Sequence, residues 1–374
     1  MPTNFRSRFT LRTACLRATA LTSVFAGLFG CGSPEAADAP SIEAESQLGS
    51  GTQVDPSNID NDPPLGKLHQ VKMDASHSLL PMEGLLGVTP PAKFDIYSLQ
   101  APVRNQSHRG VCSIFSSIGL MEMLYKKAGM ANPDFSEQYL QWAVKVQDGA
   151  FPDSEGSSDY YNLETITNYG IPAESAWAYQ ENPWTAANDP ACSSTDDGLP
   201  TRCYTNGEPP AAARAATKYK LPAARWVSSS TIKNVIYEKK VGVVVGFDFF
   251  YQAWNHRRST LPVNTASFAK GYVLYPNATD ITESQKAPAG HSVQLVGWDD
   301  NLEIQKVDAM GKPVVDAMGK PVTEKGFYLF KNSWGTTGFG VSNSKAPGYG
   351  WISYRYIASY GSAYTSNPPT IASP

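Results

Sequence analysis

The chain has 374 residues, of which 41% are hydrophobic and 17% are charged. This length permits one large or two medium globular domains with a well-buried core. The formal net charge is −3 and no basic patch stands out along the chain, so nucleic acid is not an expected partner.

The N-terminal 30 residues have the pattern of an export signal. They contain four arginines and no acid, and an apolar stretch follows that ends in Leu28-Phe-Gly-Cys31. This ending resembles the bacterial lipobox, in which the cysteine is acylated and becomes the new N-terminus; a non-lipidated signal cut nearby is the alternative. We expect a lipoprotein signal peptide at 1–30 and a lipid anchor on Cys31.

The next segment, 31–66, is rich in Ala, Ser, Pro and acidic residues and contains no basic residue before position 67. Such a composition buries too little apolar surface to fold, so we expect a flexible acidic tether. Together, the signal, the anchor and the tether predict an exported protein of the cell envelope that faces the periplasm or the exterior. The outer membrane is favoured as the membrane that holds the anchor. A folded domain is expected at 67–362 and a C-terminal tail at 363–374.

Cysteine usage agrees with export. Cys192 and Cys203 lie across a polar loop and are expected to form a local disulfide, which contributes roughly 2 to 3 kcal/mol through loop closure. The histidines are scattered, so neither a metal site nor another cofactor is expected. Cys112 then remains as an unpaired thiol in an oxidising compartment, which marks it as a candidate reactive residue.

The first half of the domain has helical periodicity. Apolar residues recur at three- and four-residue steps over 112–124, and Gly129 is placed to end that helix. Ser136 is a predicted N-cap for a helix over 137–146, and a further helix is predicted over 160–169. Cys112 would lie at a helix N-terminus, where the helix dipole favours a thiolate. Taken alone, a structural cysteine on a core-facing helix fits this pattern equally well.

The second half is predicted to be β-structure. Runs that are β-branched, aromatic or alternating predict four strands, at 241–250, 291–298, 326–331 and 350–356. The octet 307–314 is repeated identically at 315–322, and two copies of a polar Gly/Pro unit indicate a lengthened hairpin loop rather than a repeat protein. Helices followed by strands predict an α+β fold of two lobes.

Four motifs in this order resemble the papain-like cysteine peptidases. They are Gln106-x5-Cys112-x2-Phe115, Ser136-Glu-Gln-x-Leu140, Gly290-His291 with Gly297, and Asn332-Ser-Trp-Gly335. The similarity spans about 94–359. It implies a helical left lobe, about 106–215, that carries the thiol, and an antiparallel β-barrel-like right lobe, about 216–360, that carries the histidine, with the substrate cleft between them.

The resemblance also assigns roles. Cys112 corresponds to the nucleophile, His291 to the general base and acid, and Asn332 to the residue that orients the imidazole. Gln106 corresponds to a donor for the oxyanion, and Trp334 to the tryptophan that covers the His–Asn hydrogen bond.

Three departures from the family pattern affect specificity. Ser113 follows the nucleophile where an aromatic residue is usual. Arg109 replaces a cysteine, so the left-lobe disulfide of the family cannot form there. The Gly-Gly segment that binds substrate backbone has no clear match; the nearest candidate is 153–159, in which Gly156 and Ser157 are the predicted substrate-binding residues.

The leading hypothesis is a monomeric cysteine peptidase that hydrolyses peptide bonds of a peptide or protein substrate through a thioacyl intermediate. An amidase or transpeptidase on the same fold is one alternative, and a catalytically silent, peptide-binding lipoprotein is another. Residues 79–82 are expected to pack along the right lobe rather than to block the cleft.

Overall fold

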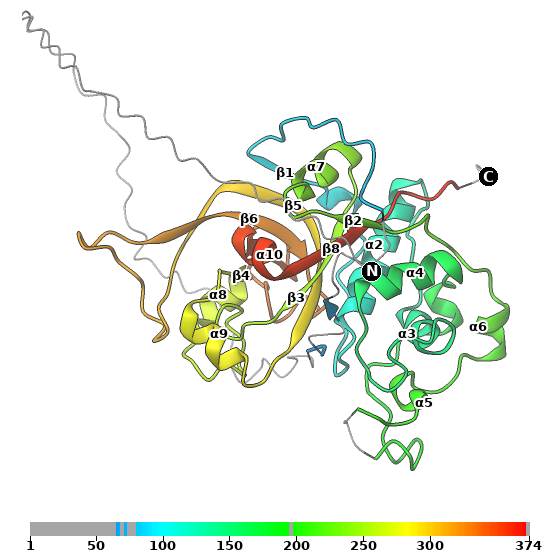
Figure 1. The fold of residues 1–374 in the computed structure, drawn as a ribbon. Helices are drawn as coiled ribbons and strands as arrows, with labels where there is room; N and C mark the ends of the chain where they lie inside the picture. Colours follow the sequence, from blue (N-terminus) through cyan, green and yellow to red (C-terminus); the bar gives the residue numbers. More distant parts are fainter. Residues whose placement is uncertain (1–64, 68–70, 73–79, 194–196, 372–374) are drawn as a thin grey trace, which may run out of the picture. The chain divides into compact units, whose positions relative to one another are not determined.

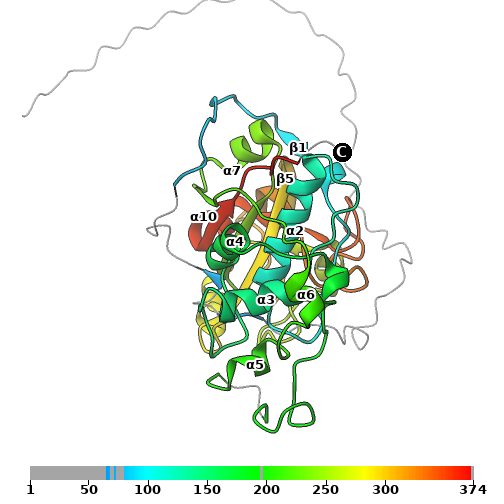
Figure 2. The ribbon, with the colours of Figure 1, turned by 90° about the vertical axis from the view of Figure 1, so that its right-hand side faces the viewer.

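A long helix, α2 (Cys112–Lys127), and a long strand, β5 (Gly290–Gln305), form the centre of the structure and lie side by side (Figure 2). The computed structural model describes residues 65–67, 71–72, 80–193 and 197–371, all within the unit Thr52–Pro374. The signal, the proposed anchor and most of the predicted tether lie outside these residues. Every residue of α2 from Cys112 to Tyr125 is buried, as expected of a helix enclosed by neighbours on all sides.

The left lobe packs short helices around α2 (Figures 1 and 2). Its remaining helices are α3 (Glu137–Val146), α4 (Asp159–Asn168), η3 (Glu174–Ala176), α5 (Thr201–Tyr204) and α6 (Ala211–Ala215). The predicted helices are confirmed. The Ser136 side chain accepts the Tyr139 N–H and so caps α3, and Gly129 follows α2 with a φ of 106°, which a glycine adopts readily.

The right lobe is built on a sheet in which β5 is an inner strand. Its strands, in chain order, are β1 (Lys93–Asp95), β2 (Arg225–Val227), β3 (Val243–Asp248), β4 (Tyr272–Val273), β5, β6 (Thr323–Lys331), β7 (Tyr349–Ser353) and β8 (Gly361–Thr365). The order across the sheet is β2-β8-β3-β5-β6-β7-β4, with β1 also paired to β5. The two-lobed α+β prediction is confirmed. However, the sheet is open and β4 pairs with β7 in parallel, so the expected antiparallel barrel is not closed.

Short helices complete the right lobe. They are η2 (Tyr97–Leu99), α7 (Ile232–Asn234), η4 (Val235–Lys239), α8 (Thr265–Lys270), α9 (Ala278–Ser284) and α10 (Tyr354–Tyr360). The helix α10 corrects one prediction, because the expected strand 350–356 ends at Ser353. The Ser353 hydroxyl accepts the N–H groups of Arg355 and Tyr356 and thereby starts a helix.

The chain beyond α10 corrects a second prediction. Residues 361–365 form β8, which lies between β2 and β3 in the sheet, so the expected tail does not begin at residue 363. In contrast, the duplicated octet does lie in the β5–β6 hairpin loop, as predicted. Asp308 and Asp316 accept equivalent backbone hydrogen bonds in the two copies.

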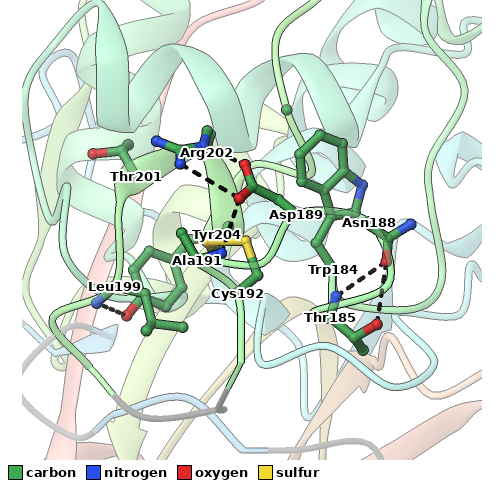
Figure 3. The surroundings of a disulfide bond; sticks show 12 residues. Trp184, Thr185, Asn188, Asp189, Ala191, Cys192, Leu199, Thr201, Arg202 and Tyr204 are labelled. Atoms are coloured by element: carbon green, nitrogen blue, oxygen red, sulfur yellow. Dashed lines mark hydrogen bonds and ion pairs between the residues drawn. A yellow bond between two sulfur atoms is a disulfide. The ribbon is translucent and has the colours of Figure 1, made fainter.

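Cys192 and Cys203 are joined by a disulfide, with an S–S distance of 2.03 Å, near the ion pair between Arg202 and Asp189 (Figure 3). Cys112 is the free cysteine of the described residues. In the same part of the chain, no helix is long and apolar enough to cross a bilayer.

Candidate active site

The Cys112 sulfur lies at the first residue of α2, beside the strand that carries His291. The backbone N–H groups of Ser292, Gly66 and Ser113 all hydrogen-bond to it. Each of these bonds favours the thiolate, but complete burial outweighs them and raises the pKa of Cys112 to about 12. The thiol and the strand next to His291 are therefore in direct contact, and in this state the thiol keeps its proton.

His291 is held in one tautomer by Asn332. Its Nε2 lies 2.9 Å from Asn332 Oδ1, which also accepts the Ser333 N–H at 2.9 Å. An amide oxygen only accepts, so Nε2 carries the proton and Nδ1 keeps its lone pair. No described residue hydrogen-bonds to Nδ1. The imidazole thus presents a free basic nitrogen, as a general base requires.

Aromatic rings enclose the imidazole. The Trp334 ring centroid lies 4.6 Å from that of His291 at an interplanar angle of 33°, and Trp254 and Phe247 contact it edge-on at 5.2 and 6.0 Å. Burial among these rings lowers the pKa of His291 to about 3, although the Asn332 hydrogen bond acts in the opposite direction. The enclosure excludes water from the His–Asn hydrogen bond, the role that the resemblance assigns to Trp334.

Gln106 connects the loop before Cys112 with the loop after Asn332. Its backbone N–H donates to the Ser333 carbonyl at 2.8 Å, and its side-chain Oε1 accepts the Ser333 hydroxyl at 2.7 Å. Its Nε2 donates to the Arg109 carbonyl at 2.8 Å. The Gln106 amide is therefore fixed in the nucleophile loop, with its nitrogen turned towards the residues that precede Cys112.

Arg109, at the position where the resemblance implies a cysteine, connects several segments of the left lobe. Its fully buried guanidinium pairs with Glu155 at 2.9 Å and also donates to Gln138 Oε1 and the Tyr204 carbonyl. The second oxygen of Glu155 accepts the Gly110 N–H at 2.9 Å. One carboxylate thus fixes both the arginine and the turn that leads into Cys112.

The two predicted substrate-binding residues, Gly156 and Ser157, lie in different surroundings. Gly156 lines a cavity of about 430 Å³ on the left-lobe side, and its carbonyl accepts the Lys145 ammonium at 2.9 Å. Ser157 is fully buried instead and accepts the Ser113 hydroxyl. Ser113 therefore joins α2 to this segment, which explains a small polar residue after the nucleophile. Of the pair, only Gly156 faces a cavity.

Leu65, Gly66 and Lys67 lie across the site. Gly290 N–H donates to the Gly66 carbonyl at 2.8 Å, and a Cβ added at Gly66 would come 3.5 Å from the Cys112 sulfur. These three residues line both the 430 Å³ cavity and one of about 770 Å³ on the right-lobe side. The described end of the predicted tether is thus seated in the cleft between two cavities.

Residues 71–72 continue this covering segment, which we call the strap (65–67 and 71–72). The Val71 carbonyl lies very close to Gly246: a Cβ added at Gly246 would lie 1.7 Å from the Val71 carbonyl oxygen. Further on, residues 80–82 pair with Trp226, so the described part of 79–82 packs along the right lobe as predicted. The cleft is nevertheless blocked, by residues earlier in the chain than those predicted to avoid it.

Sequence reasoning missed three contributors to the site. Gly66 and Gly246 have no side chain and therefore allow the strap to lie close to Cys112 and to β3. For Gly246 the sequence did offer a signal, because a glycine inside the β-branched run 243–248 indicates a close approach of another backbone. Asp159, fully buried at the start of α4, had no signal in the sequence pattern.

The described residues contain no group of three or more His, Cys, Asp or Glu side chains that could hold a metal ion. The groups brought together here are a buried thiol, a buried imidazole and an amide: the thiol hydrogen-bonds to Ser292, the residue after His291, and the imidazole hydrogen-bonds to Asn332. A thiol, an imidazole and an amide are the residue types that a cysteine-nucleophile hydrolase uses.

Comparison with known proteins gives the family. The model for papain family cysteine proteases matches residues 90–343, and the chain belongs to that family. A search of curated protein sequences gives no match. Among solved structures, xylellain, a cysteine protease from Xylella fastidiosa, is similar with a TM-score of 0.56 and 16% identity, over 82% of this chain and 98% of that one.

A second similar structure contains the cysteine protease and lectin-like domains of Cwp84, a surface layer associated protein of Clostridium difficile. Its TM-score is 0.52 with 20% identity, and the match covers 80% of this chain but 55% of that one. At these identities, the two structures support the shared fold.

Replacing Glu155 by alanine should destabilise the protein, because it leaves the buried Arg109 charge without its carboxylate. A fully buried pair broken on one side costs about 3 to 5 kcal/mol, and since the Glu155 side chain is 25% exposed we expect about 2 to 4 kcal/mol. Urea unfolding measures this loss. The matched control is Glu303→Ala, which removes the partner of Lys325 from an exposed pair and should cost less than about 1 kcal/mol. Equal losses in the two variants would contradict the role of Arg109.

Proposed function

We propose that this protein is a cysteine peptidase that hydrolyses peptide bonds through a thioacyl-enzyme intermediate. The observation that carries the proposal is the contact of the Cys112 sulfur with the His291 strand, where Asn332 leaves His291 Nδ1 as the free base. A thiol and an oriented imidazole are the two groups that acyl transfer by a cysteine requires.

Cys112, His291 and Gln106 can together account for each step of peptide-bond hydrolysis. His291 Nδ1 takes the proton of the Cys112 thiol, and the thiolate attacks the peptide carbonyl carbon. The negative oxygen that forms is stabilised by the Cys112 N–H, which has no intrahelical acceptor at the helix start, and by the Gln106 amide. The imidazolium then protonates the leaving amine, the C–N bond breaks and a thioester remains. Water, deprotonated by His291, releases the acid and restores the thiol.

Changing Cys112 to alanine tests the proposal directly. In the full chain, iodoacetamide should label Cys112, as located by mass spectrometry of the tryptic peptides, and Cys112→Ala should lower cleavage of fluorescently labelled casein by at least about 1,000-fold. Retained cleavage would show that the sulfur is not the nucleophile. Absence of both labelling and cleavage in the native chain and also in Gly66→Val, the variant expected to open the site, would instead favour the silent, peptide-binding alternative.

We further propose that the described state is a closed, inactive form. The Gly66 N–H of the strap hydrogen-bonds to the Cys112 sulfur, and the strap lysines pair with both lobes, Lys67 with Asp197 at 3.6 Å and Lys72 with Asp248 at 3.1 Å. Under the strap the pKa of Cys112 is about 12 and that of His291 about 3, so neither group is charged near neutral pH. Substrate can reach the sulfur only after the strap leaves.

A valine at position 66 should open the site. Its Cβ would lie 2.6 Å from Val71 Cγ1, and overpacking of about 1–3 kcal/mol corresponds to roughly 5- to 150-fold faster labelling of Cys112 by iodoacetamide near neutral pH. Renewed access of water would also lower the pKa of the thiol, which acts in the same direction. The control is Gly338→Val, since no atom lies within 4 Å of a Cβ added there. An unchanged labelling rate in Gly66→Val would contradict the closed-form proposal.

The N-terminal pattern leads to a proposal for location. We propose that the protein is exported and anchored by acylation of Cys31, with the peptidase domain outside the cytoplasm; the disulfide supports an oxidising compartment. In a bacterial host, the native chain should fractionate with membranes and incorporate labelled fatty acid, whereas Cys31→Ala should do neither. Fatty-acid incorporation that persists in Cys31→Ala would exclude this site of attachment.

A further inference from the structure

A buried carboxylate joins the two elements that carry the catalytic pair. Asp159, at the start of α4, accepts hydrogen bonds on Oδ1 from the hydroxyls of Ser116 at 2.8 Å and Ser117 at 3.2 Å, both on α2. Its Oδ2 accepts the hydroxyl of Ser292 on β5 at 2.7 Å. One side chain therefore links α2, α4 and β5.

The linked residues are close to the catalytic ones in the chain. Ser116 is one helical turn beyond Cys112, and Ser292 directly follows His291. The two hydroxyls also lie 2.7 Å from each other, which closes a triangle with the carboxylate. A shift of α2 against β5 would break at least one side of this triangle.

Burial makes this arrangement energetically expensive. Asp159 is fully buried, and no ion pair involves it among the described residues; its partners are hydroxyl groups. An anion that leaves water without a cationic partner carries a large desolvation cost, and burial accordingly raises the pKa of Asp159 to about 7. Apolar residues of similar volume would fill the junction without that cost. Stability alone thus gives no reason for a carboxylate here.

We propose that Asp159 is a positioning residue: its carboxylate holds the Cys112 helix against the His291 strand, and its negative charge sets how readily Cys112 loses its proton. The inference rests on the proposed peptidase function, because it concerns the geometry of the same site. The groups that face Asp159 are hydroxyls from α2 and β5 and the backbone of Gly246 on β3. The titratable groups nearest along those elements are Cys112 on α2, His291 on β5 and Asp248 on β3.

The two parts of the role have opposite effects on the reaction. The hydrogen bonds keep the sulfur and the imidazole in register, which favours attack, whereas the anion disfavours the thiolate. Removing the charge should therefore change the pH at which Cys112 reacts, whereas removing the hydrogen-bond link should change kcat. Two variants separate these two effects.

The first variant, Asp159→Asn, removes the charge and keeps the shape. In the full chain, the pH midpoint of Cys112 alkylation by iodoacetamide should fall by about one pH unit, as expected when one nearby buried charge is lost. The second, Ser292→Ala, keeps the charge and cuts the link to β5. Its midpoint should stay within about 0.3 pH units of the native value, while kcat on a fluorogenic peptide amide falls about 10- to 100-fold with KM nearly unchanged.

The matched control is Asp316→Asn, which makes the same change of charge at an exposed aspartate of the duplicated loop and should alter neither quantity. A native alkylation midpoint in Asp159→Asn, or a native kcat in Ser292→Ala, would overturn the proposal. A change in KM alone, confined to substrates with basic side chains, would also overturn it and make Asp159 a substrate contact. If neither the native chain nor Gly66→Val cleaves peptide, the peptidase proposal fails, yet the alkylation midpoints still test the charge of Asp159.

Discussion

The packing of α2 against β5 is the contact on which the site depends. It brings the Cys112 sulfur to the backbone N–H of Ser292 and thereby to the strand that holds His291. The two residues come from different lobes, so neither lobe can form the site by itself. A second connection, between Gln106 and Ser333, joins the loops at either end of the site. The site is consequently complete only when the two lobes are packed together.

The burial that assembles the pair also suppresses its chemistry. In a medium of low polarity the neutral thiol and neutral imidazole are favoured over the thiolate and imidazolium, and the pKa values of Cys112 and His291 move away from each other accordingly. The strap completes this burial through Gly66, whose missing side chain permits an approach that any other residue would hinder. Since the lysines of the strap pair with partly exposed acids, the closed state is held by bonds that solvent and salt can weaken.

Local signals explain which features the sequence could predict. Helix α3 begins at Glu137 as expected, because Ser136 caps it through contacts within four residues. The order of the motifs around Cys112, His291 and Asn332 indicated the family, and the structure joins His291 to Asn332 and the Cys112 sulfur to the neighbouring Ser292. Strand β8 could not be predicted, because its place between β2 and β3 depends on partners far away in the chain. The same holds for Asp159 and Gly66, whose importance arises from what the fold places beside them.

In the left lobe, an ion pair with a fully buried arginine stands at the position where the family resemblance implies a disulfide. A disulfide acts largely on the unfolded chain, whose freedom it reduces, whereas the Arg109–Glu155 pair exists only in the folded state and fixes geometry there. Glu155 also accepts the Gly110 N–H, so the turn into Cys112 is held by a bond that a cystine could not make. A disulfide would act by lowering the entropy of the unfolded chain. The ion pair acts instead in the folded chain, where it fixes the orientation of the loop that precedes Cys112. The disulfide that remains, Cys192–Cys203, closes a local loop, and the residues around Cys112 rely on buried hydrogen bonds and charges for their position.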